Sequence, residues 1–130
     1  MRLEDIRDYV SSLNISEHVY MGKMDHKNDC SIGVYHSKGT RPYRTSIGGP
    51  ELKSYGIKEV SILIHWNKSP RDTENVSWRL FEELRDARNV VVNNKNIKFI
   101  QLLVDEPVNV DTDENGIYEM VIEAAVVYGK

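Results

Sequence analysis

The clearest motif with possible chemistry is the acidic segment 111–116, which has the sequence Asp-Thr-Asp-Glu-Asn-Gly. It matches the first half of a calcium-binding EF-hand loop, where oxygen ligands alternate and a glycine makes the sharp turn. The second half does not match, because Ile122 occupies the position of the bidentate glutamate and Glu123 comes one residue late. Such residues also form tight turns without metal. We therefore interpret Asp111, Asp113 and Glu114 as part of an acidic turn that leads into the last strand.

Four histidines and one cysteine are further candidates for metal binding or nucleophilic chemistry. His26 is close in sequence to Cys30, and His18 and His36 would be neighbours if the first two predicted strands pair. Their spacing matches no zinc pattern. His65 lies on the polar side of a predicted strand, where a solvated or hydrogen-bonded side chain is expected. Cys30 is expected to behave as a small buried apolar residue at the start of a strand.

Other enzyme signatures are missing from the sequence: it has no nucleophile elbow, phosphate-binding glycine loop or dinucleotide fingerprint. Gly48 and Gly49 neither follow a predicted strand nor open a helix, as phosphate binding requires. We therefore predict that the protein is not an enzyme and needs no cofactor. A small metal-dependent enzyme that uses Asp111, Asp113 or the 26–30 region is the alternative from another functional class.

Charge is distributed unevenly along the chain. The net charge is −3, from 17 basic and 20 acidic residues, which argues against a nucleic-acid-binding protein. Residues 105–123 carry seven acidic residues and no Lys or Arg, whereas residues 38–58 carry five basic residues and one acidic residue. Opposite charges on two segments suit a head-to-tail contact between copies that closes into a ring. Internal pairing or simple solvation would explain the same pattern.

Length and composition predict one globular domain over residues 1–130. Hydrophobic residues make up 40% of the 130 residues, enough for a packed core. No apolar run approaches the roughly 20 residues of a membrane-spanning helix, and the charged first residues do not resemble a signal peptide. A single cysteine excludes an internal disulfide. We expect neither a membrane partner nor sequence-specific nucleic-acid binding.

Hydrophobic spacing predicts the elements that position these residues. An amphipathic helix is expected over 3–13, stopped by Asn14, and strands over 18–23 and 30–36 are expected to be joined by a hairpin connection over 25–29. Residues 37–55 have no apolar period and predict a long flexible loop. An alternating strand over 59–67 is followed by a helix, for which Ser69 is the expected cap and Pro70 the first residue.

The remaining segments predict strands. A hairpin is expected to join 90–92 to 97–104 through the turn 93–96, and a last strand covers 117–128. Most strands are thus joined by hairpins, with one helix inserted between strands. The fold class that follows is α+β, with a mainly antiparallel, mixed β-sheet and two helices packed on one face.

The order of these features resembles the tail terminator family of long-tailed bacteriophages, whose members are often labelled minor capsid proteins. The resemblance begins with an amino-terminal helix. It continues in the segments 30–35, 47–50, 60–64, 80–84, 105–107, 113–119 and 126–128. None of these segments is diagnostic singly, and their order and spacing over nearly the whole chain carry the likeness.

The resemblance implies an α+β structural protein that forms a six-membered ring on the finished tail tube. The ring would stop tube polymerisation and provide the surface that joins the tail to the head. The implied partners are other copies of the chain, the tail tube protein and the head–tail connector proteins. The implied location is the tail or neck of the virion, after assembly in the host cytoplasm. The resemblance also implies no enzymatic activity and no organic cofactor.

Within this setting the oppositely charged segments become the candidate interface. The expected docking residues on the basic segment are Lys38, Arg41, Tyr43 and Arg44, because arginine and tyrosine are frequent interface anchors. Asp111, Asp113 and Glu114 are the expected acidic partner side. A head-completion or tail-joining protein of the neck is the closest alternative, since it too would be a ring-forming interaction protein.

Overall fold

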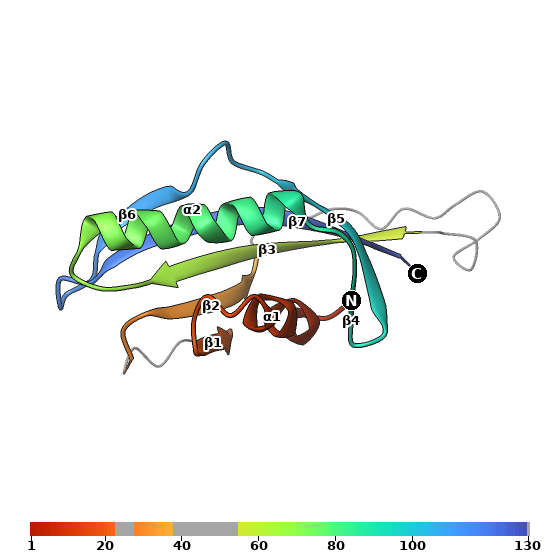
Figure 1. Cartoon of the computed structure of the whole chain (residues 1–130), viewed down its shortest axis with the longest axis horizontal. Helices are drawn as coiled ribbons and strands as arrows, with labels where there is room; N and C mark the ends of the chain where they lie inside the picture. Colours follow the sequence, from red (N-terminus) through yellow and green to blue (C-terminus); the bar gives the residue numbers. More distant parts are fainter. Residues whose placement is uncertain (23–27, 38–54, 130) are drawn as a thin grey trace.

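The computed structural model describes residues 1–22, 28–37 and 55–129, which form two helices and a seven-stranded sheet (Figure 1). The elements in chain order are α1 (Leu3–Ser12), β1 (His18–Met21), β2 (Ser31–His36), β3 (Tyr55–His65), α2 (Pro70–Asp86), β4 (Arg88–Val92), β5 (Lys95–Leu102), β6 (Val108–Thr112) and β7 (Tyr118–Gly129). No described helix is long and apolar enough to cross a membrane. The expected loop over 37–55 falls almost wholly outside the described residues.

Both helices begin and end where local chemistry favours it. The Ser69 hydroxyl accepts the N–H of Asp72 at 3.2 Å, and Pro70 is the first residue of α2, so the predicted cap is confirmed. At α1, the N–H of Arg2 donates to the Asp5 carboxylate at 2.8 Å, which satisfies a backbone donor that the helix leaves free. Asn14 follows α1 with a φ of 57°, the left-handed conformation expected of its stop residue.

The sheet is mixed and mostly antiparallel. Its strand order is β1-β2-β3-β7-β5-β4, and β6 also pairs with β7, beyond the end of β5. Strands β3 and β7 pair over their full common length, from Tyr55 opposite Gly129 to His65 opposite Glu119. These two central strands therefore run between the two ends of the molecule (Figure 1). The predicted α+β class is confirmed.

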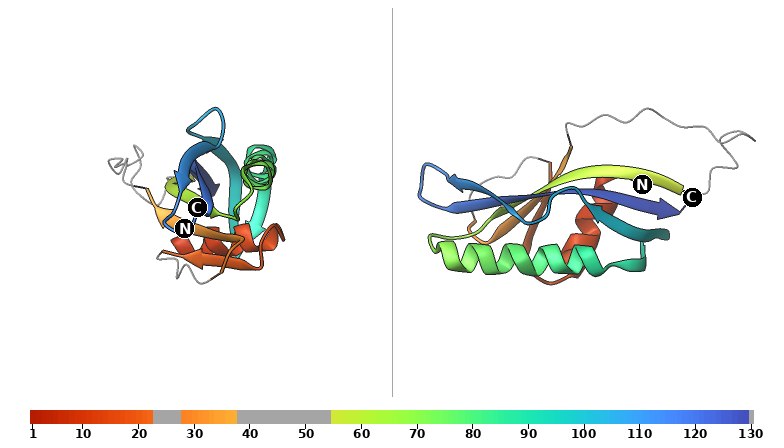
Figure 2. Two further views of the ribbon diagram at one scale, coloured as in Figure 1. Left: turned by 90° about the vertical axis from the view of Figure 1, so that its left-hand side faces the viewer. Right: turned by 90° about the horizontal axis from the view of Figure 1, so that it is seen from above.

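Both helices cover the same face of the sheet, and the core lies between them and the strands (Figure 2). Alternate residues of the central strands point toward the helices, in line with the two-residue period of a strand. The fully buried core residues include Ile6 and Val10 from α1, Leu80 and Leu84 from α2, and Ile32, Val34, Ile62, Ile64, Ile97 and Ile122 from the strands. The opposite face carries the polar pairs Ser61–Glu123 and His65–Glu119.

The predicted hairpin between the first two strands is wrong, because β1 and β2 pair in parallel. His18 lies opposite Ser31, at the same end of the pair. The hydroxyl of Ser16 holds the two starts together, since it hydrogen-bonds the carbonyl of Cys30 and accepts the N–H of His18 at 3.0 Å. A polar linker between two strands is equally compatible with either direction, so the spacing of apolar residues could not reveal this contact.

Two segments that pair with β7 also differ from expectation, and β4 and β5 each begin two residues earlier than expected. Strand β6 was not predicted, because Pro107 and its acidic surroundings favour a loop and every residue of β6 is exposed. Strand β3 begins at Tyr55, four residues earlier than the alternation indicated, and its added residues pair with the end of β7. Each of these segments is held by pairing with β7, which overrides its weak local preference.

Candidate functional site

The acidic turn at residues 113–116 forms the tip of the β6–β7 hairpin, at one end of the molecule (Figure 1, far left). Oδ1 of Asp113 accepts the backbone N–H groups of Asn115 and Ile117, both at 2.9 Å. Gly116 takes a φ of 80°, which a residue with a Cβ adopts only with strain. The turn is therefore held in one shape by its own residues, as the sequence predicted.

A buried histidine fixes this tip to the sheet. His65, the last residue of β3, is 1% exposed, and its Nδ1 lies 3.0 Å from the Glu119 carboxylate at the start of β7. The same nitrogen is 3.8 Å from Oδ2 of Asp113. The expectation of a hydrogen-bonded side chain is met, with carboxylates as the neighbours. The carboxylates of Asp113 and Glu119 thus position the turn through hydrogen bonds.

The three predicted acidic residues do not have equal roles. Asp111 and Glu114 are exposed, whereas Asp113 is partly buried and its carboxylate is engaged by the turn. Asp111 has a φ of 81° at the irregularity where β6 shifts register against β7. Within residues 1–22, 28–37 and 55–129, no group of three or more His, Cys, Asp or Glu side chains could hold a metal ion.

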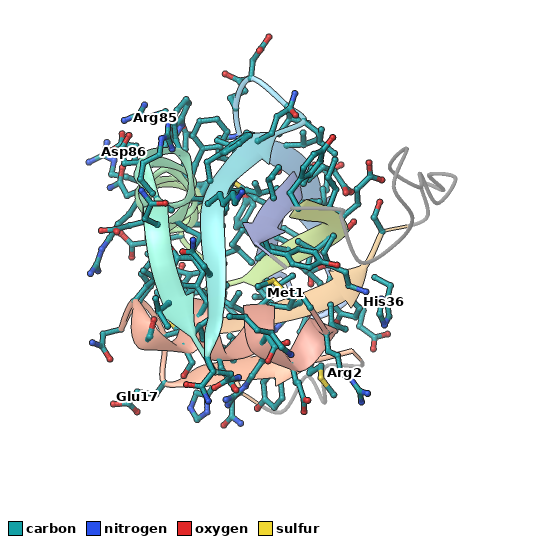
Figure 3. All side chains as sticks on the ribbon, turned by 90° about the vertical axis from the view of Figure 1, so that its right-hand side faces the viewer. Met1, Arg2, Glu17, His36, Arg85 and Asp86 are labelled. Carbon is teal, nitrogen blue, oxygen red and sulfur yellow. The ribbon has the colours of Figure 1, made fainter. Side chains whose placement is uncertain are left out.

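The opposite end of the molecule contains an open hollow of about 640 Å³. It is lined by Met1, by Asn94, Lys95, Asn96 and Lys98 of the β4–β5 hairpin, and by Tyr128 and Gly129 at the end of β7. Figure 3 shows this end, with Met1 near its middle, the end of α2 on one side and His36 on the other. The polar lining could accept a hydrogen-bonding or acidic group.

Contacts between distant parts of the chain build this hollow. The Asp5 carboxylate of α1 accepts Nζ of Lys95 at 2.6 Å and the amide of Asn93 at 2.9 Å. Asp5 is 2% exposed, and burial raises the pKa of its carboxyl group. The hydrogen bonds from Lys95, from the Arg2 backbone and from Asn93 outweigh that effect and lower the pKa to about 2. The β4–β5 hairpin is thereby tied to the amino-terminal helix.

The other predicted site residues are dispersed or outside the description. His18 lies opposite Ser31 at the start of β2, whereas His36 is the last residue of β2. Their expected proximity is therefore wrong. Cys30 is only half-buried and precedes β2 with a φ of 57°. Burial and the nearby Asp29 and Asp72 raise the pKa of its thiol, which disfavours the nucleophilic thiolate.

The docking residues expected on the basic segment lie outside the described residues. These are Lys38, Arg41, Tyr43 and Arg44, and His26 of the metal-site alternative falls outside as well. Their assignments stay predictions.

Sequence reasoning missed the residues of the hollow. A turn was expected over 93–96. Asn93 and Asn94 do form it, with φ values of 51° and 63°, whereas Lys95 and Asn96 already belong to β5. Nothing in the local pattern linked this turn to Asp5 or to the end of β7. The available signal was a lysine within a run of asparagines, where a purely structural turn favours glycine.

An exposed acidic hairpin tip and a polar hollow thus lie at opposite ends of the described structure. The sequence matches the family model described as "Bacteriophage tail terminator protein" over residues 3–129. The chain therefore belongs to the bacteriophage tail terminator family. This is a family of structural virion proteins and not a family of enzymes. No individual curated protein matches the sequence significantly.

Proposed function

We propose that this protein forms a ring, most simply a homohexamer, on the finished tail tube and so ends tube polymerisation. The ring then presents the surface to which the head–tail connector proteins attach. Assembly takes place in the host cytoplasm, and the protein stays in the tail or neck of the virion. Family membership supports termination over the alternative of a neck joining protein.

The observation that supports the ring is that the acidic turn and the described part of the basic segment lie at opposite ends of β7. The acidic turn precedes the first residue of β7, whereas Tyr55 to Lys58 of the basic segment pair with Gly129 to Val126 at its far end. A contact between unlike ends joins copies head to tail, and such contacts close into a ring when the rotation allows. Surfaces of opposite charge also set the register of the contact.

The basic segment supplies docking residues in this proposal. Lys38, Arg41, Tyr43 and Arg44 contact the acidic turn of a neighbouring copy, or the acidic surface of the tube protein. Exposed Asp111 of β6 and exposed Glu114 of the turn make the contact, and Asp113 maintains the shape of the turn. No cofactor takes part.

Electron microscopy of particles made without this protein tests termination. We expect overlong tail tubes, because nothing then stops the addition of tube subunits. Tails of normal length that lie detached from filled heads would contradict termination and support the joining alternative. A plasmid copy of the intact gene should restore both tail length and attachment.

A double substitution, Arg41→Glu with Arg44→Glu, tests the docking residues. We expect loss of ring assembly and irregular tail length. The matched control is Arg71→Glu with Arg79→Glu, which makes the same change of charge at exposed positions of α2. If the first variant assembles as well as the control, the docking assignment is wrong.

A further inference from the structure

We propose that the hollow at the end of β7 receives the acidic turn of a second copy, so that residues 113–116 of one subunit dock against Lys98 of the next. This inference rests on the proposed ring and names the contact that would hold it together. It adds a receiving surface that does not depend on the basic segment.

The turn has the properties of a preformed docking element. Glu114 and Asn115 are exposed at its tip, and neither side chain makes a hydrogen bond or ion pair with the described residues. The backbone beneath them is held by the Asp113 carboxylate and by the hydrogen bond from the N–H of Asp113 to the carbonyl of Ile117 at 2.9 Å. A rigid tip loses little conformational entropy when it binds.

The hollow lacks partners that such a turn would supply. Lys98 lines the hollow and makes no ion pair within the described part of the chain, whereas Lys95 beside it is neutralised by Asp5. The Lys98 ammonium therefore leaves room at this site for the carboxylate of a partner.

The acidic turn offers such a group, because the exposed Glu114 carboxylate suits the Lys98 ammonium. A subunit cannot make this contact with itself. The turn and the hollow are separated by the length of β7, roughly 36 Å at about 3.3 Å per residue. A contact between the turn and the hollow therefore has to join two copies.

The hollow is also continuous with the end of the molecule that the ring proposal already uses. Gly129 lines the hollow and pairs with Tyr55, the first described residue of the basic segment.

Charge exchange between the two surfaces tests the contact. Glu114→Lys makes both surfaces basic, and Lys98→Glu makes both acidic, so each variant alone should self-associate at least tenfold more weakly than the unaltered protein. An equimolar mixture should regain association, because every junction then alternates between opposite charges. The single-chain double variant should regain it as well. Sedimentation velocity at low salt measures all four, and Glu82→Lys on the exposed side of α2 is the control.

Disulfide trapping detects the contact even when the free protein associates only weakly. In a Cys30→Ser background, Asn115→Cys with Asn94→Cys should give a ladder of linked oligomers after oxidation with diamide. Each single-cysteine variant should stop at dimers. The control pair, Glu82→Cys with Asn94→Cys, should give no ladder. If the mixture shows no recovery, or the test pair links no more than the control pair, the proposed contact is wrong.

The outcome is separable from that of the proposed function. Overlong tails in the absence of the protein, together with failure of both charge exchange and trapping, would retain termination and overturn this contact. Normal tails together with recovery in the mixture would retain the contact and overturn termination.

Discussion

The two ends of this protein are built in different ways. At the acidic end, the hydrogen bonds that shape the turn link Asp113 to residues two and four positions away. At the end with the hollow, Asp5 bonds Asn93 and Lys95, which are 88 and 90 positions away. The acidic turn is therefore a local structure that a short sequence specifies, whereas the hollow exists only once the whole chain has folded.

This difference predicts where substitutions act. Changes at the hollow should alter global stability, because its residues join the amino-terminal helix to the sheet. Changes at the turn should act mainly on the turn itself. Four substitutions or conditions test this contrast, in decreasing order of expected effect.

The largest effect is expected for Asp5→Ala. The substitution removes the acceptor of Lys95, Asn93 and the Arg2 backbone at a buried position, and we expect the free energy of unfolding to fall by about 2–3 kcal/mol. Urea unfolding measures the change as a lower midpoint with an unchanged slope. Glu4→Ala, at the exposed neighbouring position, is the control and should cost less than about 0.5 kcal/mol. Equal losses in the two variants would contradict the contrast.

Acid should remove part of the same stabilisation. The pKa of Asp5 is about 2 in the folded protein, compared with 3.8 for an aspartate without these partners. The folded state therefore favours the ionised carboxylate. The resulting stabilisation is fully present above pH 3.8 and is lost as the pH falls through 2. Because Lys95 is partly exposed to solvent, we expect it to amount to about 1–2 kcal/mol.

The measurement for this acid effect compares the unaltered protein with Asp5→Asn. The difference in unfolding free energy should be constant near neutral pH and should shrink as the pH is lowered from 3.8 to about 2. A difference that does not vary with pH would show that the charge of Asp5 makes no contribution.

A smaller and local effect is expected for Asp113→Ala. The N–H groups of Asn115 and Ile117 lose their acceptor, which should cost about 1 kcal/mol. Hydrogen exchange should quicken at these two amides and stay unchanged in the β4–β5 hairpin. Asp113→Asn retains the accepting oxygen and should behave more like the unaltered protein. Faster exchange in both regions would mean that the turn is not an independent unit.

The smallest effect is a gain in stability from Asn94→Gly. Asn93 and Asn94 both have positive φ, a two-residue turn in which Asn-Gly is the preferred pair. We expect the free energy of unfolding to rise by about 0.5 kcal/mol, seen as a slightly higher melting temperature. A loss of stability would show that the Asn94 side chain supports the hollow.

What the sequence could predict follows the same division between local and distant contacts. The cap at Ser69, the stop at Asn14 and the turns at 93–94 and 113–116 were predicted because each depends on a few adjacent residues. The helix and strand identities followed from apolar spacing. The face covered by the helices followed as well, since it is the apolar one.

Features that depend on distant partners were not predictable in this way. The parallel direction of β1 depends on the contact between Ser16 and Cys30, and β6 is a strand because β7 offers it an edge. Asp5 was noticed only as a charged residue near the amino terminus, yet it positions the hollow. The acidic turn could thus be predicted, whereas the hollow lined by Lys98 could not.

The long pairing of β3 with β7 has a mechanical consequence for a ring of such subunits. A pull that enters at the acidic turn and leaves at the far end of the sheet runs along β7, at right angles to its hydrogen bonds with β3, β5 and β6. These bonds are then loaded in shear and share the force, instead of being unzipped one after another. In the proposed ring, each subunit would therefore be stiffest along the line that joins its two contact surfaces.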